Sequence, residues 1–214
     1  ATVCVVATVV TRADDLARDE AVEKAIDSLT ADPGTSGLFF DFDGVLSNIQ
    51  ADPASVQPLP EITEILGKLA KQFSTTVVLS SRPASFLWER FGGVEQLGLL
   101  GLYGLEAADS TGNISVAIEA QPWLEVMPTI RDAAWAMFGS TGVYVEDKHL
   151  SVSLHYRADR GQRAEVERWS GYARETWGVK IQPGRLAVEL KPDLQVDKGT
   201  SLAEVARSRS PVPF

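Results

Sequence analysis

Cysteine and histidine are almost absent from this chain. Cys4 is the single cysteine among 214 residues, which excludes an intrachain disulfide and a cysteine-based zinc cluster and fits a reducing cytosol. Two histidines, His149 and His155, leave little room for a histidine-rich metal site. Acidic side chains around a hard cation such as Mg²⁺ suit this set of residues better.

Long apolar runs and an excess of basic residues are absent as well. No run approaches the roughly 18 apolar residues that cross a bilayer, and the apolar N-terminal segment lacks the basic start of a signal peptide. The formal charge is −9, from 20 basic and 29 acidic side chains. Because so acidic a protein binds nucleic acid and anionic membranes poorly, we expect neither as a partner. The single cysteine leads us to expect a cytoplasmic protein. The composition leaves its oligomeric state open.

What the chain does contain is an alternation of strand and helix patterns. Apolar, β-branched runs at 38–43, 75–79 and 97–103 predict buried strands. Apolar residues at helical spacing predict a helix over 61–73 and another through Phe86 to Phe91. Strands and helices that alternate with short connections give right-handed crossovers and a parallel sheet. The sequence therefore predicts an α/β fold with a parallel core sheet.

The pattern changes after Glu106. The residues that follow predict antiparallel hairpins and helices, at 109–113, 123–138, 143–157, 162–177 and around Pro183-Gly184. We expect residues 107–190 to form an inserted α+β cap, with 37–106 and 191–214 as the two parts of the parallel core.

The two ends of the chain look incomplete. Residues 1–36 contain a strand pattern at 2–10 and a helix pattern from Asp14 to Leu29. We expect them to be an N-terminal extension or the end of an upstream domain. The apolar stretch Pro211-Val-Pro-Phe214 predicts the start of a further strand. The sequence therefore reads as part of a longer protein.

Two aspartates, Asp41 and Asp43, directly follow the first buried strand, and Gly44 then permits a sharp turn. In an open α/β sheet, ligands bind beyond the carboxyl ends of the strands. A carboxylate at such a position, near a metal, can attack phosphorus and form an aspartyl-phosphate. The alternative is a strand-ending Asp-x-Asp-Gly turn without chemistry, because both residue types are common turn formers.

Two further loops carry polar residues that could act together with the two aspartates. Ser80, Ser81 and Arg82 follow the second strand, and Lys198 precedes a helix predicted from Thr200 to about Arg207. Taken singly, Ser80 could cap the next helix and Lys198 could be a solvated surface lysine. Together the three loops supply a nucleophile, an acid/base, a hydroxyl donor and a cation, which are the groups that phosphoryl transfer requires.

The motifs resemble a known family. Asp41-Phe-Asp-Gly-Val-Leu, Ser80-Ser-Arg-Pro and Asp197-Lys-Gly are similar to the first three motifs of the haloacid-dehalogenase (HAD)-type phosphatases. The narrower resemblance is to trehalose-6-phosphate phosphatases, and it covers about residues 37–214. It is carried by Gly101-Leu-Tyr-Gly-Leu-Glu106, by the hairpin from Val145 to Arg157, and by Ala187-Val-Glu-Leu-Lys-Pro192 leading into Asp197-Lys-Gly-Thr200.

The resemblance implies a Rossmann-like HAD core with an inserted α+β cap. It also implies Mg²⁺-dependent hydrolysis of trehalose 6-phosphate, a small sugar phosphate, in trehalose biosynthesis. Asp41 would be the nucleophile and a metal ligand. Asp43 would be the acid/base and would bind Mg²⁺ through its backbone carbonyl. The phosphoryl oxygens would be held by Ser80, Ser81 and Lys198.

The cap residues that grip the sugar in this family map to Glu146, Lys148 and Glu189. The strand alternation of the 143–157 hairpin supports them, because it aims Glu146, Lys148 and His155 at one half-solvated face. The alternative for Glu146 and Lys148 is a surface ion pair of little energetic value. His155 reads as a structural hydrogen-bonding residue rather than as a catalyst.

The sequence departs from the family pattern in one important respect. The family completes its Mg²⁺ site with an acidic Gly-Asp-Asp-type loop, after the strand expected at Pro213, whereas Glu204 is the only acid in 199–214. We expect the chain as given to stop before this fourth motif, and a protein that ended there would bind metal poorly. The alternatives to the enzyme are a non-catalytic HAD-like module that binds a sugar phosphate or a partner, and a phosphatase of another sugar phosphate. Val45 and Ser81, where relatives often carry Thr and Gly, are tolerable changes.

Overall fold

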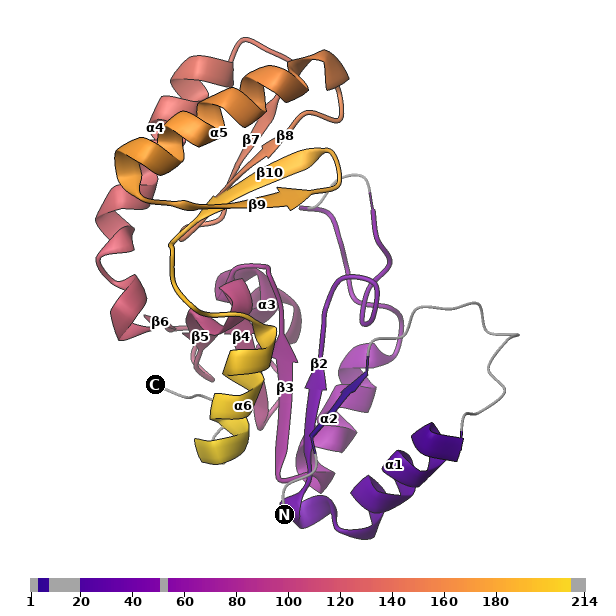
Figure 1. The fold of residues 1–214 in the computed structure, drawn as a ribbon. Helices are drawn as coiled ribbons and strands as arrows, with labels where there is room; N and C mark the ends of the chain where they lie inside the picture. The colour runs from indigo at the N-terminus through magenta and orange to yellow at the C-terminus, as the bar shows by residue number, and fades with distance from the viewer. Residues whose placement is uncertain (1–3, 8–19, 51–53, 209–214) are drawn as a thin grey trace. The chain divides into compact units, whose positions relative to one another are not determined.

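The computed structural model describes residues 4–7, 20–50 and 54–208 of the chain. The chain divides into two compact units (Figure 1). The core unit comprises Ala1–Val116 and Val196–Phe214, and the inserted unit comprises Ala117–Gln195. No helix among the described residues is long and apolar enough to cross a membrane.

The core unit is built on a six-stranded sheet in the order β1-β2-β3-β4-β5-β6. The strands are β1 (Cys4–Ala7), β2 (Gly37–Phe40), β3 (Thr75–Leu79), β4 (Leu97–Gly101), β5 (Glu106–Ala108) and β6 (Ile114–Val116). The first four run parallel, and β5 and β6 add an antiparallel hairpin beyond β4. Every residue of β3 is buried, and its β-branched sequence predicts a strand there. The unbroken apolar run of β2 is buried at Phe39 and only partly buried at Leu38 and Phe40. The predicted α/β fold with a parallel core is therefore confirmed.

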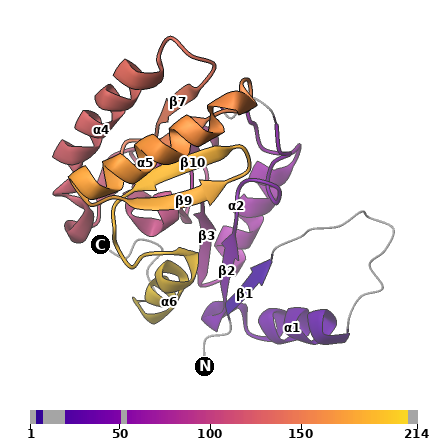
Figure 2. The same cartoon turned by 45° about the horizontal axis from the view of Figure 1, so that its top comes forward.

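Helices cover both faces of the core sheet. They are α2 (Ile62–Gln72), α3 (Ala84–Phe91) and α6 (Lys198–Ser208). Helix α1 (Glu20–Ala31) precedes β2, and short 3₁₀ turns lie at Pro33–Thr35 and Leu102–Gly104. Val78 packs against α2 and α3, whereas its neighbours Val77 and Leu79 pack against α6. Because successive strand residues point to opposite faces, this alternation places α2 and α6 on opposite sides of the sheet (Figure 2).

The inserted unit is an antiparallel sheet with helices on one face (Figure 1). Its strands, in the order β7-β8-β10-β9, are β7 (Tyr144–Asp147), β8 (Val152–His155), β10 (Ala187–Lys191) and β9 (Lys180–Gly184). The helices are α4 (Trp123–Phe138) and α5 (Arg163–Trp177), with 3₁₀ turns at Ile118–Ala120 and Arg160–Gln162. Helix residues such as Ile130 and Val166 share one core with the strand residues Val145 and Leu154.

The predicted domain boundaries differ from the structure at both ends of the core. Cys4–Ala7 pairs in parallel with β2, so part of the predicted 1–36 extension belongs to the core sheet. The hairpin after Glu106 pairs with β4, because β4 offers an open edge there. The core unit therefore extends to Val116, and the inserted unit ends at Gln195. The strand predicted at 212–214 and the first residues of the helix predicted from Asp14 lie outside the described residues.

Replacing Gly101 by Ala should strongly destabilise the core unit. A methyl group there would lie 2.6 Å from the carbonyl carbon of Pro83 and closer still to the backbone nitrogen of Ala84, neither of which can move aside easily. We expect Gly101→Ala to lower the free energy of unfolding by about 3 kcal/mol, measured by thermal unfolding. Gly93→Ala is the matched control, because no described heavy atom beyond its chain neighbours lies within 4 Å of the added methyl. Equal effects of the two substitutions would contradict this account of β4.

Candidate active site

The two aspartates flank a buried phenylalanine. Phe42 is fully buried, with its ring centroid 5.4 Å from that of Phe86 and 6.0 Å from that of Phe91 in α3. Asp41 and Asp43 on either side of it stay partly exposed. The carbonyl of Phe42 accepts hydrogen bonds from the backbone N–H groups of Leu46 and Ser47 (3.0 and 3.1 Å), and Gly44 adopts a φ of +79°. The buried ring and this tight turn together fix where both carboxylates emerge from the sheet.

Asp41 forms an ion pair with Lys198, the first residue of α6. Just before Lys198, Asp197 caps the helix: its Oδ1 accepts from the N–H of Thr200 at 2.8 Å. In return, the N–H of Asp197 donates to Thr200 Oγ1 at 2.9 Å. The Asp197-Lys-Gly sequence is therefore a capped helix start that presents an ammonium group to the first carboxylate. The structure joins these two predicted site residues.

Ser80 starts a loop that is held by backbone hydrogen bonds. The N–H groups of Leu102 and Tyr103 donate to the carbonyls of Arg82 and Ser80, at 2.8 and 2.9 Å. The Ser80 hydroxyl accepts from the N–H of Arg82 at 3.1 Å, so it closes a turn rather than capping α3. Among the described residues, no acceptor is found for the hydroxyl proton of this fully buried serine. Ser81 follows it and is partly exposed.

Asp43 is held by Arg82, which the sequence motif contains but to which we assigned no role. Arg82 Nε donates to Asp43 Oδ2 at 2.9 Å, and Arg82 Nη2 donates to Asp43 Oδ1 at 2.8 Å. The guanidinium carbon also lies 4.7 Å from the ring centroid of Phe86. A two-pronged bond of this kind fixes the plane of the carboxylate as well as its position. The only signal in the sequence is a basic residue in the loop after the second strand.

Arg90, near the C-terminal end of α3, anchors part of the loop that follows the aspartates. Arg90 lies over the Phe86 ring, with its guanidinium carbon 3.4 Å from the centroid. Its Nε and Nη2 donate to the carbonyls of Val56 and Ala54, at 2.8 and 3.1 Å. Burial lowers the pKa of this guanidinium below its ordinary value. Phe86 thus contacts both the arginine that holds Asp43 and the arginine that fastens residues 54–56.

Glu106 is a buried acid that supports the Ser80–Arg82 loop. Its side chain is almost fully buried, and Oε2 accepts from the N–H of Ala84, the first residue of α3, at 2.8 Å. A carboxylate suits this position, because the N-terminus of a helix has unpaired N–H donors and a partial positive charge. Sequence reasoning quoted Glu106 only as part of a family motif, whereas the structure gives it a supporting role.

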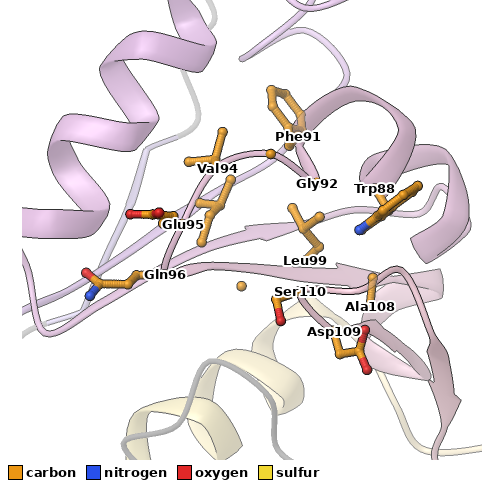
Figure 3. Close-up of a pocket in the computed structure, with 13 residues that line it drawn as sticks. Trp88, Phe91, Gly92, Val94, Glu95, Gln96, Leu99, Ala108, Asp109 and Ser110 are labelled. Carbon is orange, nitrogen blue, oxygen red and sulfur yellow. The ribbon is translucent and has the colours of Figure 1, made fainter.

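Two cavities are lined by described residues of the core unit, and one of them adjoins this site. A hollow of about 240 Å³ is lined by Phe39, Phe40, Asp41, Leu79, Lys198, Gly199 and Leu202, so it lies beside the ion pair. The other, of about 330 Å³, lies at the start of β4. Figure 3 shows Trp88 at one end of it and Glu95 and Gln96 at the other. No predicted site residue is among the described residues that line this second cavity.

The three predicted sugar-binding residues come together on the inserted unit. Lys148 Nζ lies 3.7 Å from Glu146 Oε2 and 3.4 Å from Glu189 Oε1. Ser151 donates to Glu189 Oε1 at 2.8 Å, and His155 Nε2 lies 2.8 Å from Glu146 Oε2. The side chains of the three charged residues are only 11–16% exposed, so they are not a solvent-screened surface pair. The face is also less solvated than predicted, since Ser151 is buried beneath them.

The residues after β2 could hold a magnesium ion in part. No group of three or more His, Cys, Asp or Glu side chains suited to a metal is found within residues 4–7, 20–50 and 54–208. Asp41 supplies a carboxylate at this turn, and the backbone carbonyl of Asp43 offers a second oxygen, since the carboxylate of Asp43 is held by Arg82. Mg²⁺ in proteins keeps several waters and is commonly bound by one or two carboxylates together with substrate phosphate, so this donor set fits the ion.

Solved structures with a similar fold define the class of protein. A crystal structure described as a trehalose-6-phosphate phosphatase related protein matches with a TM-score of 0.72 and 20% identity, over 81% of this chain and 75% of that chain. A haloacid dehalogenase-like hydrolase from Bacteroides thetaiotaomicron matches with a TM-score of 0.52 and 16% identity, over 80% of this chain and 76% of that one. The chain thus has the fold of the haloacid dehalogenase-like hydrolases, as predicted.

Sequence comparison narrows the assignment. A profile of the family described as trehalose-phosphatase matches residues 39–210, and the chain belongs to that family. The trehalose-phosphate phosphatase of Mycobacterium leprae is 38% identical over 181 residues, which cover 82% of this chain and 41% of that protein. The Mycobacterium tuberculosis protein of the same description is 34% identical over 172 residues, covering 77% of this chain and 42% of that protein. The chain therefore spans about two fifths of the length of these relatives.

Truncating Glu106 should destabilise the loop that carries Ser80 and Arg82. Glu106→Ala leaves the N–H of Ala84 without its carboxylate acceptor in a buried position, which should lower the free energy of unfolding by about 2 kcal/mol. Glu106→Gln keeps an acceptor oxygen and should lose less. Urea unfolding measures both, and Glu119→Ala, at an exposed acid, should change little. If Glu106→Ala unfolds at the same urea concentration as Glu119→Ala, the supporting role is wrong.

Proposed function

We propose that the protein is a Mg²⁺-dependent phosphatase that hydrolyses trehalose 6-phosphate to trehalose and phosphate in trehalose biosynthesis. The observation that carries the proposal is the ion pair between Asp41 and Lys198 at the carboxyl ends of the core strands. In an α/β fold this edge is where ligands bind. Membership of the trehalose-phosphatase family and the names of the mycobacterial relatives support the substrate. The single cysteine supports a cytoplasmic location.

The chemistry needs two carboxylates with different roles. A carboxylate oxygen of Asp41 attacks phosphorus, and the bond from phosphorus to the sugar oxygen breaks while Asp43 gives that oxygen a proton. Asp43 then takes a proton from a water molecule, which attacks the aspartyl-phosphate and releases phosphate and free Asp41. Lys198 and the hydroxyls of Ser80 and Ser81 hold the phosphoryl oxygens as charge develops on them.

The carboxylate of Asp41 and the backbone carbonyl of Asp43 would hold Mg²⁺. Bound there, the ion would offset negative charge on the phosphoryl group. Lys198 and Arg82 already balance the two carboxylates with positive charge.

The inserted unit is proposed to select the sugar. Glu146, Lys148 and Glu189 offer carboxylate acceptors and an ammonium donor, which is the combination that recognises several hydroxyl groups at once. Their mutual contacts and low exposure support a site that is already arranged before the sugar arrives. Such preorganisation favours binding because little side-chain freedom is lost when the ligand is bound.

The nucleophile assignment is tested by Asp41→Asn. The amide cannot attack phosphorus, so release of phosphate from trehalose 6-phosphate in the presence of Mg²⁺ should fall by roughly a thousandfold or more. A panel of other sugar phosphates, assayed with the unmodified protein, measures preference. Unchanged turnover in Asp41→Asn would refute the mechanism. If another sugar phosphate is hydrolysed more efficiently than trehalose 6-phosphate, the proposed substrate is wrong. Absence of any phosphate release would favour a non-catalytic binding module.

Arg82 is proposed to orient Asp43 as the acid/base. Arg82→Ala removes the two-pronged bond that orients Asp43. The leaving sugar oxygen of trehalose 6-phosphate needs a proton from Asp43, so kcat on this substrate should fall by roughly 10–100-fold. 4-Nitrophenyl phosphate has a leaving group that needs little protonation, so its kcat should fall much less.

The control for Arg82→Ala is Arg163→Ala, which breaks an exposed helical ion pair with Glu167 and should change neither rate. A purely structural effect of Arg82 would lower turnover of both substrates equally, and that result would refute the orienting role.

A further inference from the structure

One face of the inserted unit's sheet carries side chains in ordered rows. Helices α4 and α5 share the core with the face of the sheet that carries Val145 and Leu154, so the other face carries the polar residues. The strand register aligns Glu146, Ser153, Glu189 and Gln182 in one row across the four strands. The neighbouring row on the same face is Tyr144, His155, Ala187 and Gly184. The second row therefore adjoins the carboxylates of the first.

An aromatic pair begins the second row. The rings of Tyr144 and His155 lie 5.8 Å apart between centroids, with an interplanar angle of 33°. His155 is held in place by Glu146, whose Oε2 lies 2.8 Å from its Nε2. Tyr144, in contrast, is 59% exposed although it is a large aromatic residue. An aromatic ring that is fixed on one side and open on the other is a ready contact surface.

The other two residues of the second row, Ala187 and Gly184, have little or no side chain. Ala187 and Gly184 carry the smallest side chains, and Gly184 is exposed while Ala187 is partly so. Ala187 and Gly184 therefore form a shelf on the sheet. The aromatic pair lies at one end of this shelf, and Glu189 and Gln182 lie along one side of it. A sugar ring, which has an apolar C–H face, fits such a shelf, with its hydroxyl groups directed to the carboxylate and amide of the first row.

We propose that Tyr144 is a specificity-determining residue, which with His155 forms a platform for the second pyranose ring of a disaccharide phosphate. The proposal rests on the proposed function, in which Glu146, Lys148 and Glu189 bind the sugar. It extends that site from the hydroxyl-binding row to the aromatic row beside it. The platform distinguishes a disaccharide from a monosaccharide, because a single ring bound at the charged row leaves the shelf empty.

The test compares substrates of different size in Tyr144→Ala. KM for trehalose 6-phosphate should rise about tenfold. KM for glucose 6-phosphate, which has one ring, and for 4-nitrophenyl phosphate, which has no sugar, should stay unchanged. Tyr144→Phe keeps the ring and should behave as the unmodified protein, whereas Tyr144→Leu, with apolar bulk but no ring, should follow Tyr144→Ala. The control is Tyr172→Ala, at a tyrosine of similar exposure (56%) on α5. The proposal is overturned if KM changes equally for all three substrates or for none.

A binding measurement separates this proposal from the function on which it rests. Calorimetric titration with trehalose itself needs no catalysis. If the protein does not hydrolyse trehalose 6-phosphate yet binds trehalose, and Tyr144→Ala weakens that binding about tenfold, the platform stands and the proposed activity fails. If hydrolysis is found but Tyr144→Ala binds trehalose as tightly as the unmodified protein, the activity stands and the platform fails. No binding of trehalose by the unmodified protein also overturns the platform.

Discussion

A short left-handed turn at Leu102–Gly104 holds the loops of the candidate active site together. Leu102, Tyr103 and Gly104 have φ values of 48°, 64° and 101°. Such conformations cost about 1–3 kcal/mol for each non-glycine residue, so contacts around them must hold them in place. The contacts are the hydrogen bonds to the Ser80–Arg82 loop and the bond from Ser201 Oγ to the carbonyl of Tyr103 at 2.6 Å. One turn therefore positions both the loop after β3 and the helix that carries Lys198.

Charge balance follows from this positioning. Two carboxylates that emerge from one turn repel each other, and each is matched here by a cation from a different loop: Lys198 for Asp41 and Arg82 for Asp43. In the inserted unit, by contrast, one ammonium group, that of Lys148, lies near two carboxylates, those of Glu146 and Glu189. The pairs Lys198–Asp41, Arg82–Asp43 and Lys148–Glu189 join residues far apart in the sequence, so they depend on the surrounding fold to bring the partners together.

The strands, the helices and the polar loops of the candidate active site could be predicted from the sequence because their signals are local. Helix α4 spans Trp123–Phe138 as its apolar spacing predicts, and β3 spans Thr75–Leu79. The pairing of Arg82 with Asp43, across 39 positions, has no local signal, and neither has the burial of Glu106 against Ala84. The predicted domain boundary after Glu106 differs from the observed one for a related reason. A hairpin pattern alone does not tell which sheet edge the hairpin will join, and here it joins β4.

The two polar sites share one structural device. In Asp41-Phe42-Asp43, a fully buried aromatic residue separates two partly exposed acids, and in Tyr144-Val145-Glu146 a buried valine separates an exposed tyrosine from a carboxylate. Because an extended strand alternates its side chains between two sides, burying Val145 commits Tyr144 and Glu146 to the other face of β7. Phe42 lies just beyond β2, and there the buried ring anchors the turn from which both acids emerge. The hydrophobic core therefore sets the direction of the chemistry-bearing groups. A substitution at Phe42 or Val145, both buried, would therefore shift the neighbouring polar groups.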